Sequence, residues 1–162
     1  MVRRAAVFVA VLGGATGALL MLDTVPTSLE RAPPRFFSTL SEAEIAVGAR
    51  FTLPAYFPDH LEWPPSVIEA RAVPLQVAID VHDRGTGDLV LVLREWEGEE
   101  PHFRPAMDLR PTGQGPQWEL GLDRSGREWR RARVRDQERQ VELTARLPDR
   151  ELRRMLDSLG RE

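Results

Sequence analysis

The residues best suited to chemistry in this sequence are arginines that gather in its C-terminal third. Positions 124 to 154 hold eleven arginines and six acidic residues, whereas the whole chain of 162 residues has a net charge of −3. A local excess of positive charge attracts anionic partners such as a lipid headgroup or an acidic polymer. The alternative is a solvated face on which the arginines pair with interleaved acids. The predicted anionic-partner surface consists of Arg127, Arg130, Arg131, Arg133, Arg135 and Arg139.

Histidines and acids give a weaker signal for a metal site. His60, His82 and His102 are far apart in the sequence, and none has metal-ligand spacing to another. Asp80 and His82 alternate on one face of a predicted strand and Asp83 follows, which allows a weak cation site or an ordinary solvated edge. Since zinc needs three or four converging ligands, we predict no metal and no cofactor.

Catalytic patterns are missing from the sequence. Ser125 lies in the turn-like segment 123–126 without the nucleophile-elbow pattern, and Glu99 and Glu100 are adjacent in a polar stretch. Paired catalytic carboxylates must instead be held across a cleft. There is no phosphate-binding or dinucleotide-binding glycine motif, and the lack of cysteine excludes thiol catalysis. We therefore predict that the protein is not an enzyme.

Four tryptophans occupy or adjoin predicted strands, at positions 63, 96, 118 and 129. Large aromatic side chains dominate core burial, so the simplest interpretation is that they belong to the core. The alternative is an apolar groove or cavity, which Trp96 or Trp118 would line.

The N-terminus has the pattern of an export or anchoring segment. Residues 1–4 include Arg3 and Arg4, and residues 5–22 form a run of 18 residues without a charge. A helix of that length is about 27 Å long, which just spans the hydrocarbon core of a bilayer. The two arginines keep their end in the cytoplasm, so the rest of the chain lies outside.

A cleavable signal peptide has a similar pattern, so this alternative stays open. Apolar residues 19–22 continue the run beyond the plausible cleavage point, which favours a single-pass signal anchor over a secreted or periplasmic product. Residues 23–37 are rich in proline and are predicted to be a linker. Residues 38–162 are predicted to be one extracytoplasmic domain.

Local patterns in this domain predict a helix, then strands, then a second helix. Ser41 and Glu44 have the spacing of a capping box, Leu40 and Ile45 that of a hydrophobic staple, and Gly48 ends the predicted helix after about residue 47. Alternating apolar residues predict strands over 67–73, 75–82 and 89–96, the last two joined by the turn 83–88. Further short strands are expected near 106–109, 118–122, 127–134 and 141–145.

The last predicted element is an amphipathic helix that begins near Pro148. Its apolar stripe comprises Leu152, Met155, Leu156 and Leu159, and Gly160 closes it. Between the first helix and the strands, Pro54 and Pro58 make 51–58 an extended loop over the core edge. The order of helix, strands and helix predicts an α+β domain with an antiparallel sheet.

Several of these motifs together resemble a bacterial domain family of unknown function. They are Leu40-Ser41, Leu53-Pro54, Tyr56-Phe57-Pro58, Trp129, the strand 141–145 and the terminal segments 147–152 and 157–159. The family occurs behind a single membrane helix in envelope proteins, including the extracytoplasmic part of anti-sigma-factor-like proteins. The resemblance implies a curved antiparallel sheet with flanking helices, similar to lipoprotein-carrier-like envelope domains, and it supplies no catalytic residues.

These observations predict a non-catalytic binding or interaction domain on a membrane-anchored bacterial envelope protein. Its partner would be an envelope protein or lipid, besides the membrane that holds residues 5–22. The alternative is a carrier of lipid or another hydrophobic ligand, with a cavity between sheet and helices. Nucleic acid is not expected as a partner, because the sequence pI is about 5.7.

Overall fold

Within the residues that the structure describes, eight strands form a single open sheet. The computed structural model describes residues 33–100, 110–114, 118–136 and 138–160. The strand order is β1-β2-β3-β4-β8-β7-β6-β5, and every neighbouring pair is antiparallel. The strands are β1 (Arg35–Phe37), β2 (Ile68–Arg71), β3 (Gln76–His82), β4 (Leu89–Glu97), β5 (Arg110–Gln114), β6 (Glu119–Leu122), β7 (Glu128–Asp136) and β8 (Arg139–Ala145).

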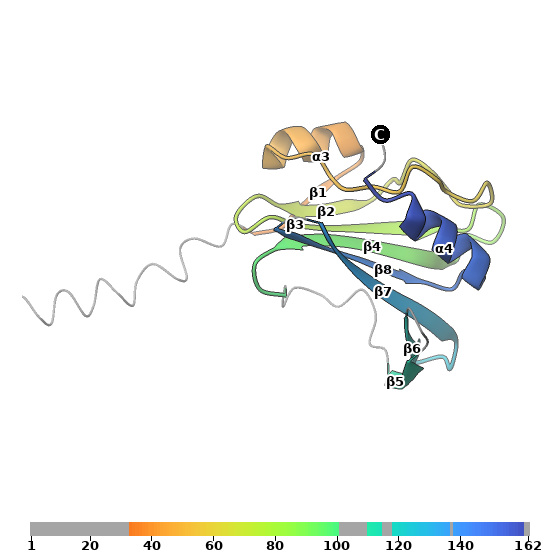
Figure 1. Ribbon diagram of the computed structural model, residues 1–162. Coiled ribbons are helices and arrows are strands. Elements are labelled where there is room, and N and C mark those ends of the chain that lie inside the picture. The colour runs from red at the N-terminus through yellow and green to blue at the C-terminus, as the bar shows by residue number, and fades with distance from the viewer. Residues whose placement is uncertain (1–32, 101–109, 115–117, 137, 161–162) are drawn as a thin grey trace, which may run out of the picture. The chain divides into compact units, whose positions relative to one another are not determined.

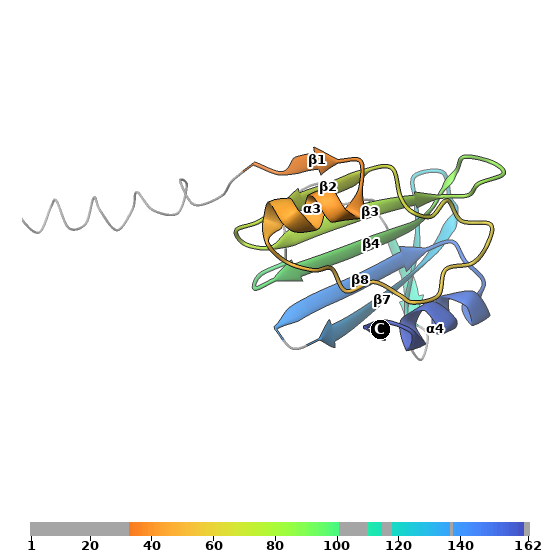
Figure 2. The same cartoon turned by 90° about the horizontal axis from the view of Figure 1, so that it is seen from above.

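In the described part of the chain, two helices accompany the sheet, α3 (Leu40–Val47) and α4 (Asp149–Asp157). Figures 1 and 2 show both helices on the same face of the sheet, α3 above its β1–β3 side and α4 beside β7 and β8. An antiparallel sheet with its helices segregated to one face confirms the predicted α+β class. We call the opposite side the helix-free face, because neither described helix covers it.

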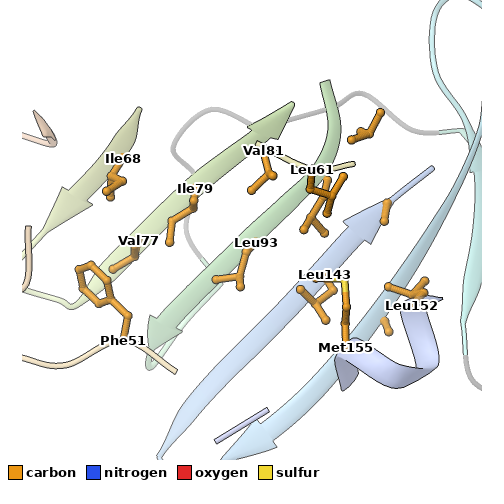
Figure 3. Close-up of a cluster of buried hydrophobic side chains, with 14 of the residues drawn as sticks. Phe51, Leu61, Ile68, Val77, Ile79, Val81, Leu93, Leu143, Leu152 and Met155 are labelled. Atoms are coloured by element: carbon orange, nitrogen blue, oxygen red, sulfur yellow. The ribbon is translucent and has the colours of Figure 1, made fainter. Parts of the chain in front are cut away.

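The core lies between the sheet and these helices. Figure 3 shows Ile79, Leu93 and Leu143 side by side on neighbouring strands, with Leu152 and Met155 of α4 next to them. All five side chains are buried completely or nearly so. Burying a large aliphatic side chain contributes about 1.5–3 kcal/mol, so this cluster is the main source of stability.

The loop between α3 and β2 closes the core edge, as its prolines predict. Phe51 is buried, and Pro54 forms an isolated β-bridge with Leu159 just beyond α4. Further along the loop, Phe57 and Trp63 stack with their ring centroids 3.7 Å apart. The loop therefore connects α3 with the segment just beyond α4, on the same face of the sheet as the helices.

The predicted N-terminal capping box and staple of the first helix are wrong, whereas the helix itself and its end at Gly48 are confirmed. The N-cap is Thr39, whose hydroxyl accepts a hydrogen bond from the Glu42 amide, so the helix begins before Ser41. Glu44 instead accepts a hydrogen bond from the amide of Phe51, and Ile45 is 79% exposed and forms no staple. Threonine and serine can both cap a helix, and here Thr39, two residues before Ser41, occupies the cap position.

The strand pattern is largely confirmed. The hairpin of β3 and β4, the three later strands and the terminal helix all lie where alternation and helical spacing predict them. Two boundaries differ. Residues 35–37, assigned to the linker, form β1, and the expected strand near 106–109 falls outside the described residues, with β5 following at Arg110–Gln114. A strand of three residues that follows two prolines is too short to show the alternation of apolar and polar residues that predicts strands.

The N-terminal unit, residues 1–32, lies outside the described part of the chain. The predicted membrane segment 5–22 therefore stays a prediction. Among the residues that the structure describes, no helix is long and apolar enough to cross a bilayer.

Candidate functional site on the helix-free face

Cross-strand pairing arranges charged side chains in rows across the helix-free face. Residues directly opposite one another in an antiparallel pair project to the same side of the sheet. Arg94 of β4 is opposite Glu142 of β8, and Glu142 is opposite Arg133 of β7. In the adjacent row, Thr144 of β8 is opposite Arg131 of β7. Leu93 and Leu143 beside these residues point to the core, so Arg94 and Glu142 point away from it.

Glu142 is the centre of this arrangement. Its side chain is only 4% exposed, and the Arg133 Nε donates a hydrogen bond of 2.8 Å to its Oε2. The Arg131 Nε lies 3.7 Å from the same oxygen, and the Arg94 Nη1 lies 3.9 Å from Oε1. The Thr144 hydroxyl donates a hydrogen bond of 3.3 Å to Oε1. One buried carboxylate thus draws together three guanidinium groups from β4 and β7.

The three arginines do not have equal environments. Burial lowers the pKa of Arg94, and the charge of Glu142 only partly offsets this. For Arg133 burial acts in the same direction, but the hydrogen bond and charge of Glu142 outweigh it and raise its pKa. The Arg131 Nε is buried and has no hydrogen-bond partner in the part of the chain that the structure describes. An arginine guanidinium stays charged at neutral pH and carries several donors, which is the chemistry that pairs with anions.

Two acids at the rim also contact the arginines of this cluster. The Arg133 Nη2 lies 2.8 Å from Oε1 of Glu100, and the Arg131 Nη1 lies 3.8 Å from Oε2 of Glu119. Glu100 and Glu119 are 56% and 48% exposed. Exposed ion pairs contribute about 0–1 kcal/mol, so an anionic group from outside can replace either acid at small cost.

The structure divides the six predicted arginines between three places. Arg131, Arg133 and Arg135 share the helix-free face, because alternate residues of β7 point the same way. Arg130 lies on the helix-covered side, where it contacts Asp149 of α4. Arg139 lies on the same side and contacts the buried Glu95. Arg127 lies in the turn before β7.

Interleaved acids pair with these arginines, as in the alternative interpretation of the sequence. Arg127 contacts Asp123, and Arg130 contacts Glu128 as well as Asp149. Arg139 contacts Glu97 in addition to Glu95. The surface is therefore a mosaic of ion pairs, and Arg131, Arg133 and Arg135 are the predicted arginines that share the helix-free face.

A second buried carboxylate lies on the opposite face of the sheet. Glu95 of β4 accepts hydrogen bonds from the Thr52 amide at 2.7 Å, the Thr52 hydroxyl at 3.2 Å and the Arg139 Nη1 at 2.8 Å. Arg139 also donates to the Arg50 carbonyl. Burial works against the charge of Arg139, but its hydrogen bond to Glu95 raises its pKa. This cluster ties the loop over the core to the sheet.

The remaining candidates do not converge on one site. Trp118 belongs to the core below Arg153 of α4, whereas Trp96 lies on the helix-free face, opposite Gln76 and Gln140. The two tryptophans therefore cannot line one cavity together. Trp129 is buried and donates its indole N–H to Asp123 in the turn that holds Ser125.

The histidines are also separate from the arginine cluster. The His82 Nδ1 lies 3.1 Å from the Gly87 carbonyl, and the carboxylate of Asp83 accepts bonds from the amides of Gly85 and Thr86 within its own turn. His102 lies outside the described residues. Within the described ranges, no three histidine or acidic side chains form a group that could hold a metal ion.

Sequence analysis missed Arg94 and Glu142. Both were visible as polar residues alternating with apolar ones in predicted strands, which is the available signal for a face away from the core. Their proximity depends on the pairing of β4 with β8, strands separated by more than forty residues in the sequence.

Searches for similar proteins add no functional assignment. No protein-family model, no curated protein and no solved structure matches this chain. The resemblance to envelope domains of anti-sigma-factor-like and lipoprotein-carrier-like proteins thus stays a prediction.

Proposed function

We propose that this chain is a membrane-anchored bacterial envelope protein whose extracytoplasmic α+β domain is a non-catalytic binding domain. Its binding surface is the helix-free face, and its partner carries negative charge. The observation that supports this most is the set of arginines from β4 and β7 around the buried Glu142. The apolar run 5–22 behind two arginines supports the anchor and the location of the domain outside the membrane.

Anion binding follows from the different exposure of the arginines. Arg133 is 40% exposed at its side chain and is fixed by Glu142 from below, so its guanidinium is positioned before a partner arrives. Such preorganisation reduces the entropy that binding costs. Arg135 lies exposed on the same face, one alternate position further along β7. Together they provide a partner with charge-assisted hydrogen bonds.

The binding test uses the full chain in nanodiscs of neutral lipid. Its affinity for vesicles containing anionic phospholipid and for soluble poly-L-glutamate is measured at low and at physiological salt. We expect binding of at least one of these anions, weakened by salt and by replacing Arg133 and Arg135 with alanine. Arg153→Ala on the other face is the control and should bind like the parent. Binding that ignores both salt and the double replacement would refute the proposed surface.

Two further assays test the rest of the proposal. The purified chain should hydrolyse no member of a panel of ester, peptide and glycan substrates above background. It should also stay in the membrane fraction after alkaline washing, since a cleaved signal peptide would release the domain. Clear turnover of any substrate would refute the non-catalytic function, and quantitative release would refute the anchor.

A further inference from the structure

Half of β7 lies at an edge of the sheet. β7 pairs with β8 from Arg130 to Asp136, but β6 pairs with it only from Glu128 to Arg131. Within the described residues, no strand pairs with residues 132–136 on the side away from β8. Figure 2 shows this end of β7 at the outer margin of the sheet. Edge strands present rows of backbone donors and acceptors to which another extended chain can add.

The side chains of this edge alternate in charge and polarity. Arg133 and Arg135 project to the helix-free face, and Val134 between them projects to the other side, where it is 38% exposed. Alternate residues of a strand are about 6.6 Å apart. A strand added to this edge places its own side chains directly opposite these three. The complementary sequence is therefore an acid, an apolar residue and a second acid.

β8 already supplies most of this pattern from the inner side. It sets Glu142 opposite Arg133 and Val141 opposite Val134. Arg133 keeps its Nε on Glu142, while its Nη2 contacts the exposed Glu100. A second acid arriving from the outer side would replace Glu100, whose exposed ion pair is weak.

Charge argues against a second copy of this chain at the same edge. Two antiparallel copies of β7 centred on Val134 would place Arg133 of one copy opposite Arg135 of the other. Like charges directly opposite one another destabilise a strand pair. The edge thus disfavours self-association and favours a different chain that carries acids.

We propose that residues 132–136 of β7 are the docking site of an extended acidic peptide segment, which joins the sheet as an additional strand. This inference rests on the proposed function and specifies its partner as a segment with the pattern acid, apolar residue, acid. Backbone hydrogen bonds supply affinity in this mode, and the alternate side chains supply specificity. Arg133 and Arg135 select the two acids, and Val134 contacts the apolar residue between them.

The test uses a fluorescent peptide with Glu-Val-Glu at its centre and the full chain in nanodiscs of neutral lipid. We expect saturable binding by fluorescence anisotropy and slower hydrogen exchange of amides in residues 132–136. Arg135→Glu should weaken binding about tenfold, and so should N-methylation of alternate peptide amides, since each removes charged or backbone hydrogen bonds. Arg153→Glu on α4 is the matched control and should have no effect. Thermal melting of Arg135→Glu checks that the variant is folded.

The possible outcomes separate this inference from the proposed function. If the N-methylated peptide binds like its parent, or if only poly-L-glutamate and anionic vesicles bind, the face recognises anions without edge pairing and the inference is refuted. Concentration-dependent dimerisation that protects residues 132–136 would show a second copy at the edge and refute it as well. If peptide, polymer and vesicles all fail to bind, the proposed function itself fails.

Discussion

Glu95 and Glu142 are buried carboxylates on neighbouring strands, yet they face opposite sides of the sheet and have different surroundings. Glu95 accepts two hydrogen bonds from Thr52 and one from the guanidinium group of Arg139. Glu142 has three guanidinium groups within 4 Å, and one of them, Arg133, donates a hydrogen bond.

Under the proposed function, this difference assigns stability to the surroundings of Glu95 and anion binding to those of Glu142. A carboxylate matched by one arginine and a backbone amide fixes a loop to the sheet, because each group satisfies the other. A carboxylate surrounded by several arginines fixes their positions while leaving donors for another anion. We therefore expect changes at Glu95 to affect folding and changes at Glu142 to affect binding.

The largest expected effect is that of Glu95→Ala. Removing the buried carboxylate takes away the acceptor of the Thr52 amide and leaves Arg139 with the more exposed Glu97, which should lower the free energy of unfolding by about 3 kcal/mol. Urea denaturation measures this loss. Anion binding by the folded fraction should be unchanged. A loss below 1 kcal/mol would mean that water replaces the carboxylate. It would contradict the stabilising role that the comparison assigns to Glu95.

Glu142→Gln should have a smaller effect on stability than Glu95→Ala, and it should strengthen anion binding. The amide keeps the shape and the hydrogen bond from Arg133, so the free energy of unfolding should fall by about 1–2 kcal/mol. Removing the negative charge should strengthen binding of poly-L-glutamate at low salt. Weaker binding of this anion by a folded variant would contradict this prediction and would mean that the charge of Glu142 is needed to position the arginines.

Asp123 offers a pH-dependent comparison with these glutamates. Partial burial opposes its charge, but hydrogen bonds from Arg127 and the Trp129 indole outweigh this and lower its pKa well below the ordinary range. A carboxyl with a lowered folded-state pKa stabilises the protein above its unfolded pKa of about 4, and this contribution is lost as the pH falls further.

Asp123→Asn should therefore unfold at lower denaturant concentration than the parent at pH 7. The gap between the two unfolding midpoints should narrow at pH 3. Denaturation followed by tryptophan fluorescence at both values measures it, with the exposed Asp59→Asn as control. A gap that is independent of pH would mean that the shape of the turn, and not its charge, provides the stability.

Arg127→Ala should have the smallest effect of the set. Its ion pair with Asp123 is half exposed at the arginine, and such pairs contribute within about 0.5 kcal/mol. Because Arg127 lies in the turn and not on the helix-free face, anion affinity should also stay unchanged. A marked loss of anion binding would extend the binding surface into the turn.

Much of the fold could be predicted from local patterns. Alternation over 75–82 and 89–96 gave β3 and β4, and helical spacing from Leu152 to Leu159 gave α4. The exact start of α3 could not be predicted, because two nearby hydroxyl residues can cap a helix and Thr39, not Ser41, does so. The pairing of β4 with β8 is set by packing of the whole sheet, which no single segment encodes.

The candidate site was predicted only in part for the same reason. Proximity in sequence grouped Arg130 with Arg131, although adjacent residues of a strand point to opposite faces. Strict use of the period of two would have separated Arg130 from the alternate arginines of β7. The contribution of Arg94 and Glu142 required the three-dimensional pairing.

The most direct test of the central claim is a charge-reversal titration of the helix-free face. The full chain in nanodiscs of neutral lipid, with and without the replacements Arg133→Glu and Arg135→Glu, is titrated with poly-L-glutamate and with poly-L-lysine at low salt. We predict that the parent binds poly-L-glutamate and that the folded double variant loses this binding and gains affinity for poly-L-lysine. Equal affinity of parent and double variant for poly-L-glutamate would contradict the assignment of this face as the binding surface.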